Sequence, residues 1–357
     1  MESSNSIVKL FEEKPMVKIC APMVRYSRLQ FRSLVRKYEC DLCFTPMIMA
    51  DSFVKSSEAR ANDFKTNEGD RPLITQFGAN NLEDFISAAQ MVAPYCDGVD
   101  LNCGCPQRWA MKEGYGSALL YKPELVKEMV RQLREKIPKP FSISVKIRLL
   151  SELKKTVDLC KTLEACGVTF LTVHGRTPAQ RTEPVNMEAF REIRQSVTIP
   201  LVANGDVKTL EDAEKLQQLT GYKGVMSARG MLQNPAMFAG FKQTPVSCIE
   251  DWLSLTLGEH LPFMIFHNHL VFMVEKILKK ADRRVFNYLR TTPDVVKFLQ
   301  EHLEVKVPTW YDPMSYQELT VDNKYKPDVP PNKLSIIDQP KSVLDGIDVL
   351  FNNSCKV

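Results

Sequence analysis

The sequence contains no long run of apolar residues. None of its apolar stretches approaches the roughly 18 consecutive apolar residues of a membrane-spanning helix. The first residues, MESSNSIVKLFEEK, lack the apolar core of a secretory signal. A formal net charge of only +4 over 357 residues permits a nucleic-acid partner but does not require one. We therefore expect a soluble, intracellular protein with no membrane partner, located in the cytoplasm or, as the alternative, in the nucleus.

Recognisable disulfide and metal patterns are also missing, although the chain has 10 cysteines. Cys40 and Cys43 have the spacing of a metal-ligand or redox pair, but no second such pair and no histidine pair completes a zinc site. A strand pattern, DLCFT, also runs through Cys43. Buried thiols in a reducing compartment behave as small apolar side chains. We therefore expect free cysteines and no bound metal.

Short apolar runs alternate with longer amphipathic segments between Val17 and Ser227, which is the pattern of parallel βα units. Eight of these runs predict strands, and eight is the number that closes a (β/α)8 TIM barrel, an α/β fold. The GxGxxG turn that would favour the alternative, an open doubly wound sheet, is absent. The predicted strands are residues 17–21, 42–45, 73–77, 98–102, 142–146, 170–174, 201–204 and 224–227.

Helix-start signals lie between these predicted strands. Asn81 can cap a helix that runs to Ala93, and Pro123 suits the first turn of another. Thr209 and Asp212 form a start that resembles a capping box. These signals predict helices at the positions that βα units require.

The chain divides into four predicted regions. Residues 1–15 form an N-terminal extension and residues 16–242 the barrel. Helical periodicity after Pro235 predicts a small, all-helical C-terminal domain at residues 243–306. Residues 307–357 are proline-rich and weakly periodic, so we predict a mostly irregular tail.

Polar and glycine residues gather directly after the predicted strands, and in a barrel these strand ends meet on the face that builds active sites. Gly205 and Gly230 would let backbone N–H groups approach an anion, with Arg229 to pair with a phosphate oxygen. Alone, Asn204-Gly205-Asp206 is equally well explained as a tight turn. Two glycine junctions at neighbouring strand ends favour a phosphorylated cofactor.

Three further polar side chains lie at predicted strand ends. Gln76 and Lys146 suit the polar pyrimidine edge of a flavin, which becomes negative on reduction. A lysine that ends the apolar run ISVKIR is costly to bury without an anionic partner, which favours a functional role over packing. His174 has the same placement, although a single histidine at a strand end is often only a hydrogen-bonded structural residue.

Two cysteines, Cys103 and Cys105, follow the fourth predicted strand in the segment NCGCP. In an extended chain their side chains point in opposite directions, so one of them would face the pocket. Either thiol could act as a nucleophile or a proton donor, and both could be inert loop residues. Geometry alone does not choose between them.

Eight segments occur in this order along the chain: APMVRYSRLQFR, TPMIMADSF, LITQFGAN, DLNCGCPQRWAMKEGYGSALL, SVKIR, LTVHGRT, ANGDV and ARGMLQNPAMFAG. Taken together, these segments resemble the dihydrouridine synthase family, and RYS, TPMI and CPQRWA are most similar to its eukaryotic type-4 branch. The similarity covers the chain from about Cys20 to beyond Phe286.

The resemblance implies an FMN-dependent enzyme that reduces the C5–C6 double bond of uridine in the D-loop of tRNA, at positions 20a and 20b, with NADPH or NADH as reductant. In this family reduced flavin delivers a hydride to C6 of the uracil and a cysteine protonates C5. The second cysteine of NCGCP, Cys105, matches that acid. The basic segment Lys276, Lys279, Lys280, Arg283 and Arg284 is the candidate RNA-binding surface of the helical domain, and a solvated helix face is its alternative.

The resemblance also assigns the other site residues. Pro22, Met23 and Val24 would lie under the isoalloxazine ring. The polar edge of the ring would contact Gln76, Lys146 and His174, and Asn102 and Arg176 would contact the substrate. The phosphate of FMN would be held by Asn204, Gly205, Asp206, Ala228 and Arg229.

Three positions depart from the pattern that is usual in the wider family: Arg25 after APMV, Pro46 within Thr45–Met47, and Ala228 where glycine is common. The first two match the type-4 branch, and the third is a small change. Two other functions compete with the implied one. One is a small-molecule flavin dehydrogenase of the dihydroorotate type, and the other is a catalytically inactive RNA-binding barrel.

Overall fold

The computed structural model describes residues 6–259, 261–314 and 316. The chain divides into two compact units, Met1–Gln243 and Thr244–Val357. Most of the predicted tail, residues 307–357, lies outside the described residues. The four predicted regions and their limits stay predictions.

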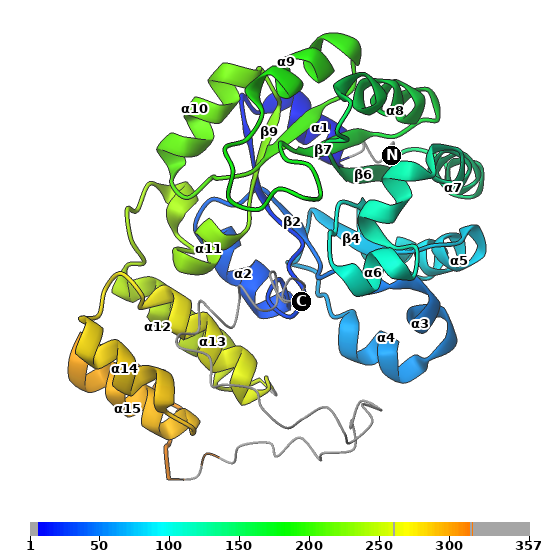
Figure 1. Cartoon of the computed structure of the whole chain (residues 1–357). Coiled ribbons are helices and arrows are strands. Elements are labelled where there is room, and N and C mark those ends of the chain that lie inside the picture. Colours follow the sequence, from blue (N-terminus) through cyan, green and yellow to red (C-terminus); the bar gives the residue numbers. More distant parts are fainter. Residues whose placement is uncertain (1–5, 260, 315, 317–357) are drawn as a thin grey trace. The chain divides into compact units, whose positions relative to one another are not determined.

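The first unit is a closed barrel of eight parallel strands (Figure 1), as predicted from the sequence. The barrel closes because β1 pairs with β9 on one side and with β2 on the other, and β2 pairs with β4. Its strands are β1 (Val17–Cys20), β2 (Leu42–Phe44), β4 (Leu73–Gly78), β5 (Gly98–Cys103), β6 (Ser142–Arg148), β7 (Phe170–His174), β8 (Leu201–Asn204) and β9 (Gly224–Ser227).

A ninth strand, β3 (Ile48–Met49), was not predicted. It pairs with the end of β4, where Ile48 lies opposite Phe77 and Met49 opposite Gly78. Two residues are too few to produce a readable alternation of apolar and polar side chains. The strand lengthens the rim of the barrel without changing its closure.

Helices surround the barrel (Figure 1), and the three predicted helix starts are confirmed. Asn81 Oδ1 accepts the N–H of Asp84, and Pro123 is the first residue of its helix. The helices of this unit are α1 (Ser6–Glu13), α2 (Leu29–Lys37), α3 (Ala50–Lys55), α4 (Ser57–Asp63), α5 (Leu82–Val92), α6 (Arg108–Lys112), α7 (Pro123–Lys136), α8 (Leu153–Ala165), α9 (Met187–Ser196), α10 (Leu210–Thr220) and α11 (Arg229–Gln233). Three short 3₁₀ helices, Ala93–Tyr95, Gly116–Tyr121 and Met237–Ala239, complete it.

The capping box of α10 offers a test of local stability. Thr209 accepts the N–H of Asp212, and the carboxylate of Asp212 accepts the N–H of Thr209. Replacing Thr209 with alanine leaves the N–H of Asp212 without this acceptor, so we expect the free energy of unfolding to fall by about 1 kcal/mol. Urea denaturation measures the change. Thr209→Ser keeps the hydroxyl and should behave like the wild type, so an equal loss in both variants would contradict the capping role.

Helix α1 packs against the end of the barrel at which the strands begin. Phe11 is buried, and its ring centroid lies 5.2 Å from that of Phe170, the first residue of β7. Phe170 also contacts Phe44 of β2, at 6.4 Å. Phe11 thus packs at the amino-terminal end of β7, whereas the polar residues lie at the carboxyl-terminal ends of the strands.

The described part of the second unit is helical, as predicted. It contains α12 (Val246–Thr256), α13 (Phe263–Met273), α14 (Lys280–Tyr288) and α15 (Thr292–Leu303). Helix α13 contacts each of the other three. Phe286 is buried, its carbonyl lies 2.9 Å from Nε2 of His267, and its ring packs 5.3 Å from that of Phe298. No helix in the described residues of either unit is long and apolar enough to span a membrane.

Candidate active site at the barrel mouth

The strand register brings the predicted polar residues together at the carboxyl-terminal ends of neighbouring strands. Asn102 on β5 is paired in register with Lys146 on β6, and His174 on β7 with Asn204 on β8. Gln76 lies one strand further, on β4. Residues that are paired across parallel strands or lie two apart on one strand share a face, so these side chains lie on the same face of the sheet, near the carboxyl-terminal ends of the strands.

The mouth has a strongly positive electrostatic environment, as His174 shows. Burial lowers the pKa of this imidazole well below its usual value, and four nearby positive charges add to the effect: Arg148, Lys146, Arg176 and Arg229. His174 is therefore neutral at neutral pH. A site with this excess of cations suits a ligand that carries negative charge.

Lys146 provides one of these cations without a fixed partner. None of the described residues hydrogen-bonds to its Nζ or forms an ion pair with it. Burial and the neighbouring charge of Arg148 lower the pKa of Lys146 to about 8, while Asp100 and Cys105 act in the opposite direction. Its ammonium group is mostly charged at neutral pH and can bind an anion or a carbonyl oxygen.

The junctions after β8 and β9 both require glycine. Gly205 has φ +132, and a Cβ atom there would lie 2.5 Å from Cγ1 of Val185. At Gly230 a Cβ atom would lie 2.4 Å from the carbonyl oxygen of Val207. The side chain of Asn204 joins the two strand ends, since its Nδ2 donates to the carbonyl of Met226 at 3.0 Å.

These junctions fit a phosphate group. Arg229 is exposed and has no ion-pair partner among the described residues. Lys146 and Arg229 both contribute positive charge to the surroundings of His174, so two unpaired cations lie in the same region. A tight turn by itself explains the glycine at position 205, because two successive residues, Gly205 and Asp206, have a positive φ, which is 58° at Asp206. The unpaired cations are the feature that a tight turn does not explain.

Arg176 and Asp206 form an ion pair beside His174. Arg176 is only 1% exposed, and its Nε donates to the carbonyl of Glu183. Its Nη1 lies 3.4 Å from Nε2 of His174. The guanidinium of Arg176 therefore contacts Glu183, Asp206 and His174. Its direct contact with a substrate stays a prediction.

The loop after β5 separates the two cysteines. Cys103 is buried at the end of the strand, whereas Cys105 is partly exposed. Burial raises the pKa of the Cys105 thiol, while a backbone hydrogen bond from Gln107 and the charges of Arg148 and Lys146 lower it to a lesser extent. Cys105 therefore stays protonated at neutral pH, as a proton donor must.

Three groups hold the Cys105 loop. Oδ1 of Asn102 accepts the N–H of Cys105 at 2.9 Å and that of Gly104 at 3.1 Å. Nε of Arg148 donates to the carbonyl of Gly104 at 2.9 Å. Gly116, with φ +60, packs so closely that a Cβ atom would lie 2.6 Å from the carbonyl oxygen of Cys105. The position of the thiol is thus tightly restricted.

The segment after β1 supplies an apolar surface. Val24 is 51% exposed, Pro22 is half-buried and Met23 is buried. Ser27 fixes the turn, because its Oγ accepts the N–H of Met23 at 2.9 Å. Exposed apolar side chains directly after a barrel strand can support a planar ring.

Two residues of this site were missed by sequence reasoning. Arg148 holds the Cys105 loop, and Asp100 lies inside the barrel below Asn102, where its carboxylate accepts hydrogen bonds from Gln76 and Ser144. The signal that could have found them is the two-residue period of a strand: Arg148 follows Lys146 by two positions, and Asp100 precedes Asn102 by two.

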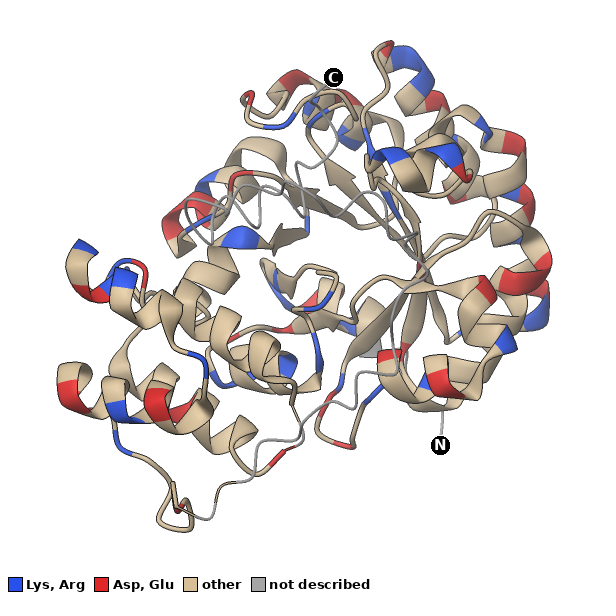
Figure 2. Ribbon diagram, turned by 60° about the horizontal axis from the view of Figure 1, so that its bottom comes forward, with Lys and Arg blue, Asp and Glu red and all other residues tan. Residues whose placement is uncertain are grey.

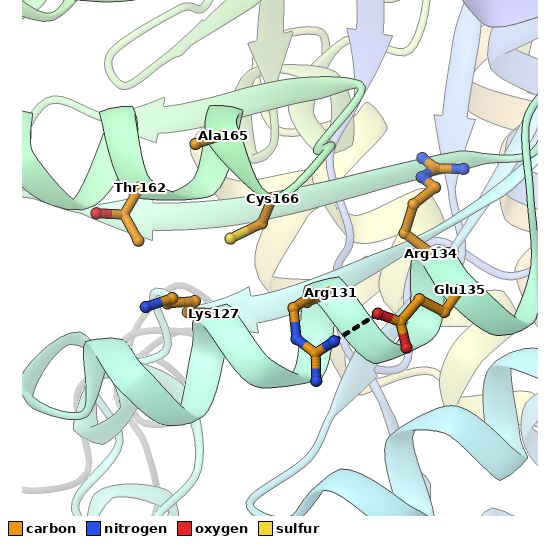
Figure 3. A pocket seen from close by; sticks show the side chains of 7 residues that line it. All are labelled: Lys127, Arg131, Arg134, Glu135, Thr162, Ala165 and Cys166. Carbon is orange, nitrogen blue, oxygen red and sulfur yellow. Dashed lines mark hydrogen bonds and ion pairs between the residues drawn. The ribbon is translucent and has the colours of Figure 1, made fainter.

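A separate groove of about 510 Å³ lies between α7 and α8 on the outside of the barrel (Figure 3), lined by Lys127, Arg131, Arg134, Glu135, Thr162, Ala165 and Cys166. Its basic groups already have partners. Arg131 pairs with Glu128 and Glu135, and Arg134 donates to the carbonyls of Phe141 and Gly167. The surrounding helices carry Lys and Arg next to Asp and Glu (Figure 2), so we assign the groove no ligand.

Among the described residues, no group of three or more His, Cys, Asp or Glu side chains could hold a metal ion. The described cysteines are free thiols. Cys40 and Cys43 are buried, with their sulfur atoms 3.8 Å apart. The side chains at the mouth include one protonated thiol, one neutral imidazole and several cations.

A family model and several similar proteins agree on one family. Residues 19–309 match the model of the family described as dihydrouridine synthase. A protein of Mus musculus named tRNA-dihydrouridine(20a/20b) synthase (NAD(P)+)-like is 53% identical over 84% of this chain and 93% of its own length. The Homo sapiens protein of the same name is 52% identical over 84% and 95%. The tRNA-dihydrouridine(20a/20b) synthase of Schizosaccharomyces pombe is 45% identical over 84% and 93%. The chain belongs to the dihydrouridine synthase family.

Proposed function

We propose that this protein reduces the C5–C6 double bond of uridine to dihydrouridine in the D-loop of tRNA, at positions 20a and 20b, with bound FMN and with NADPH or NADH as reductant. The observation that carries the proposal is the combination of a protonated Cys105 with the unpaired Lys146 at one barrel mouth, in a chain of this family. The names of the relatives support tRNA as the substrate and the two positions.

The residues at the mouth fit FMN. Its phosphate would bind at the junctions of Gly205, Asp206, Ala228 and Arg229, with Asn204 holding the two strand ends together. Asp206 is acidic and paired with Arg176, so its contribution comes from its backbone N–H. Reduced FMN, when bound, supplies the hydride for C6 of the uracil.

The polar edge of the ring would meet Lys146, His174 and Gln76. The ammonium group of Lys146 stabilises negative charge there, and the neutral His174 can donate one hydrogen bond. Both amide atoms of Gln76 already bind Asp100 and Asn102, which leaves one N–H for the ring. Pro22, Met23 and Val24 would support the ring from below.

Cys105 would supply the proton. Its raised pKa keeps the thiol protonated, and the proton passes from Sγ to C5 of the uracil while a hydride adds to C6. The products are dihydrouridine and a thiolate, and the partial exposure of Cys105 lets solvent restore the proton. Asn102 and Arg176 would orient the base.

A uridine in folded tRNA must leave its stack to enter the mouth, which costs on the order of a few kcal/mol. Contacts between the protein and the RNA backbone must offset this cost. Helix α14 carries Lys280, Arg283 and Arg284, and Arg284 is exposed. We propose that this helix and the adjacent Lys276 and Lys279 bind phosphates of the tRNA.

Position-specific transcripts test the proposed substrate. A tRNA with uridine at both 20a and 20b should gain two dihydrouridines per molecule, and replacing either uridine with cytidine should remove one. Sequencing of the reduced nucleotides assigns each position. Modification at another uridine of the same transcript would overturn the assignment to 20a and 20b while leaving the reaction type intact.

The reaction should lose rate as the pH rises through the pKa of Lys146, about 8. The folded protein has a lowered pKa for this group, so the charge is present below that value and lost above it. We expect the single-turnover rate to be level near neutral pH and to decline in this window, before Cys105 ionises. A rate that stays level until the thiol titrates would contradict a role for the Lys146 charge.

A further inference from the structure

A chain of hydrogen bonds runs from the inside of the barrel to the Cys105 loop, and every donor in it points the same way. The N–H of Cys105 donates to Oδ1 of Asn102 at 2.9 Å, and Nδ2 of Asn102 donates to Oε1 of Gln76 at 2.9 Å. Nε2 of Gln76 then donates to Oδ2 of Asp100 at 2.8 Å. The chain ends at Asp100, whose Oδ1 also accepts the hydroxyl of Ser144 at 2.7 Å.

The strand register explains why these groups meet. Gln76, Asp100 and Ser144 are partners across β4, β5 and β6, and Asn102 lies two residues after Asp100 on the same face of β5. Asp100 is 0% exposed and Gln76 is 1% exposed, so water does not compete for these bonds. The arrangement forms a buried, continuous path from β6 to the loop.

The chemistry of the groups gives the chain its direction. A carboxylate only accepts hydrogen bonds, so Nε2 of Gln76 must face Asp100 and Oε1 must face Asn102. Asn102 must then present Nδ2 to Gln76 and keep Oδ1 for the N–H groups of Gly104 and Cys105. Without an obligatory acceptor at position 100, both amides could turn over, and a turned Asn102 would present a donor to two donors.

Stability does not account for a carboxyl group at this position. Burial raises the pKa of Asp100 to about 6, while Ser144, Gln76 and Lys146 act in the opposite direction. A raised carboxyl pKa means that the fold favours the neutral form, so stability is lost as the pH rises from the unfolded pKa through about 6. At neutral pH the ionised Asp100 therefore weakens the fold.

We propose that Asp100 is a positioning residue for the reaction: its carboxylate orients the amides of Gln76 and Asn102, and Asn102 thereby holds the backbone of Cys105. The inference rests on the proposed function. Asp100 does not touch the substrate and acts through the two amides. The orientation of the acid loop accounts for a carboxylate at this position.

The test compares Asp100→Asn with Asp97→Asn in the full-length, FMN-loaded protein. Asp97 lies at the opposite end of β5, where it pairs with Arg71 at 2.7 Å and accepts the N–H of Leu73 at 2.7 Å. Asp97→Asn should lower Tm and leave kcat unchanged. Asp100→Asn should show the reverse, with Tm at neutral pH equal to or above that of the wild type and kcat reduced on the order of tenfold, while KM for tRNA is unchanged.

Hydrogen exchange measures directly how firmly the backbone of the loop is held. The amide hydrogens of Gly104 and Cys105 should exchange faster in Asp100→Asn than in the wild type and at the wild-type rate in Asp97→Asn. An Asp100→Asn variant with wild-type kcat and unchanged exchange, or with a lowered Tm that accounts for its lost activity, would overturn the proposal. Exchange and Tm are measured without substrate, so they test the role of Asp100 in the loop independently of turnover. A wild type that formed no dihydrouridine would refute the proposed function instead.

Discussion

Replacing Cys105 with alanine is expected to reduce the rate of dihydrouridine formation on the order of 10²–10⁴-fold. The variant removes the proton donor and changes little else, because residue 105 is held through its own backbone. Its N–H donates to Oδ1 of Asn102, and its carbonyl accepts the N–H of Ser117. Binding of FMN and tRNA should stay within about twofold of the wild type, since neither contact depends on the thiol. Single-turnover assays with pre-reduced enzyme and nucleoside mass spectrometry measure the loss.

Cys103→Ala is the matched control for this variant. Cys103 has the same side chain two residues earlier, but it is 1% exposed and lies at the end of β5. Losing its buried sulfur should lower stability slightly and leave the rate per folded molecule unchanged. Equal losses in the two variants would mean that the loop tolerates no change at either cysteine, and a fully active Cys105→Ala would exclude the thiol as the acid.

Replacing Lys146 with methionine is the second change with a large expected effect. Methionine has nearly the same length and removes only the charge, at a group with no hydrogen-bond partner among the described residues. Loss of a preorganised charge that stabilises a developing anion typically lowers the rate on the order of 10²–10³-fold. FMN should also bind more weakly, which fluorescence titration of the free flavin measures.

The stability of Lys146→Met relative to the wild type provides an independent check. Burial and Arg148 lower the pKa of Lys146 to about 8, so the folded state disfavours its charged form. Lys146→Met should therefore keep or raise Tm at neutral pH while it lowers activity. Lys127→Met, on the outer helix α7, is the control, because this lysine pairs with Glu124 at the surface. A Lys146→Met protein with normal rate and normal FMN affinity would remove Lys146 from the site.

The barrel could be predicted from sequence because its strands are buried and apolar, and its helix starts carry specific capping residues. The eight strands were found, and Asn81, Pro123 and Thr209 mark helix starts as expected. Strand β3 was not predicted because its two residues, Ile48 and Met49, are too few to produce a readable alternation. The packing of α1 against the barrel was not predicted either, because the contact of Phe11 with Phe170 joins residues far apart in sequence.

The positions of several candidate site residues could be predicted, and their roles stay predictions. The convergence of Asn102, Lys146 and His174 follows from the position of each residue at a strand end. The choice between the two cysteines did not follow from spacing, since it depends on which thiol the barrel buries. The pairing of Arg176 with Asp206 and the chain that ends at Asp100 depend on the register between strands, which a single sequence does not contain.

The most direct test of the account is to incubate the purified full-length protein, loaded with FMN, with NADPH and unmodified tRNA and to measure dihydrouridine by nucleoside mass spectrometry. The account predicts dihydrouridine in the tRNA with the wild type and almost none with Cys105→Ala. No dihydrouridine from a flavin-loaded wild type, accompanied by reduction of a free pyrimidine or by binding of tRNA alone, would contradict it.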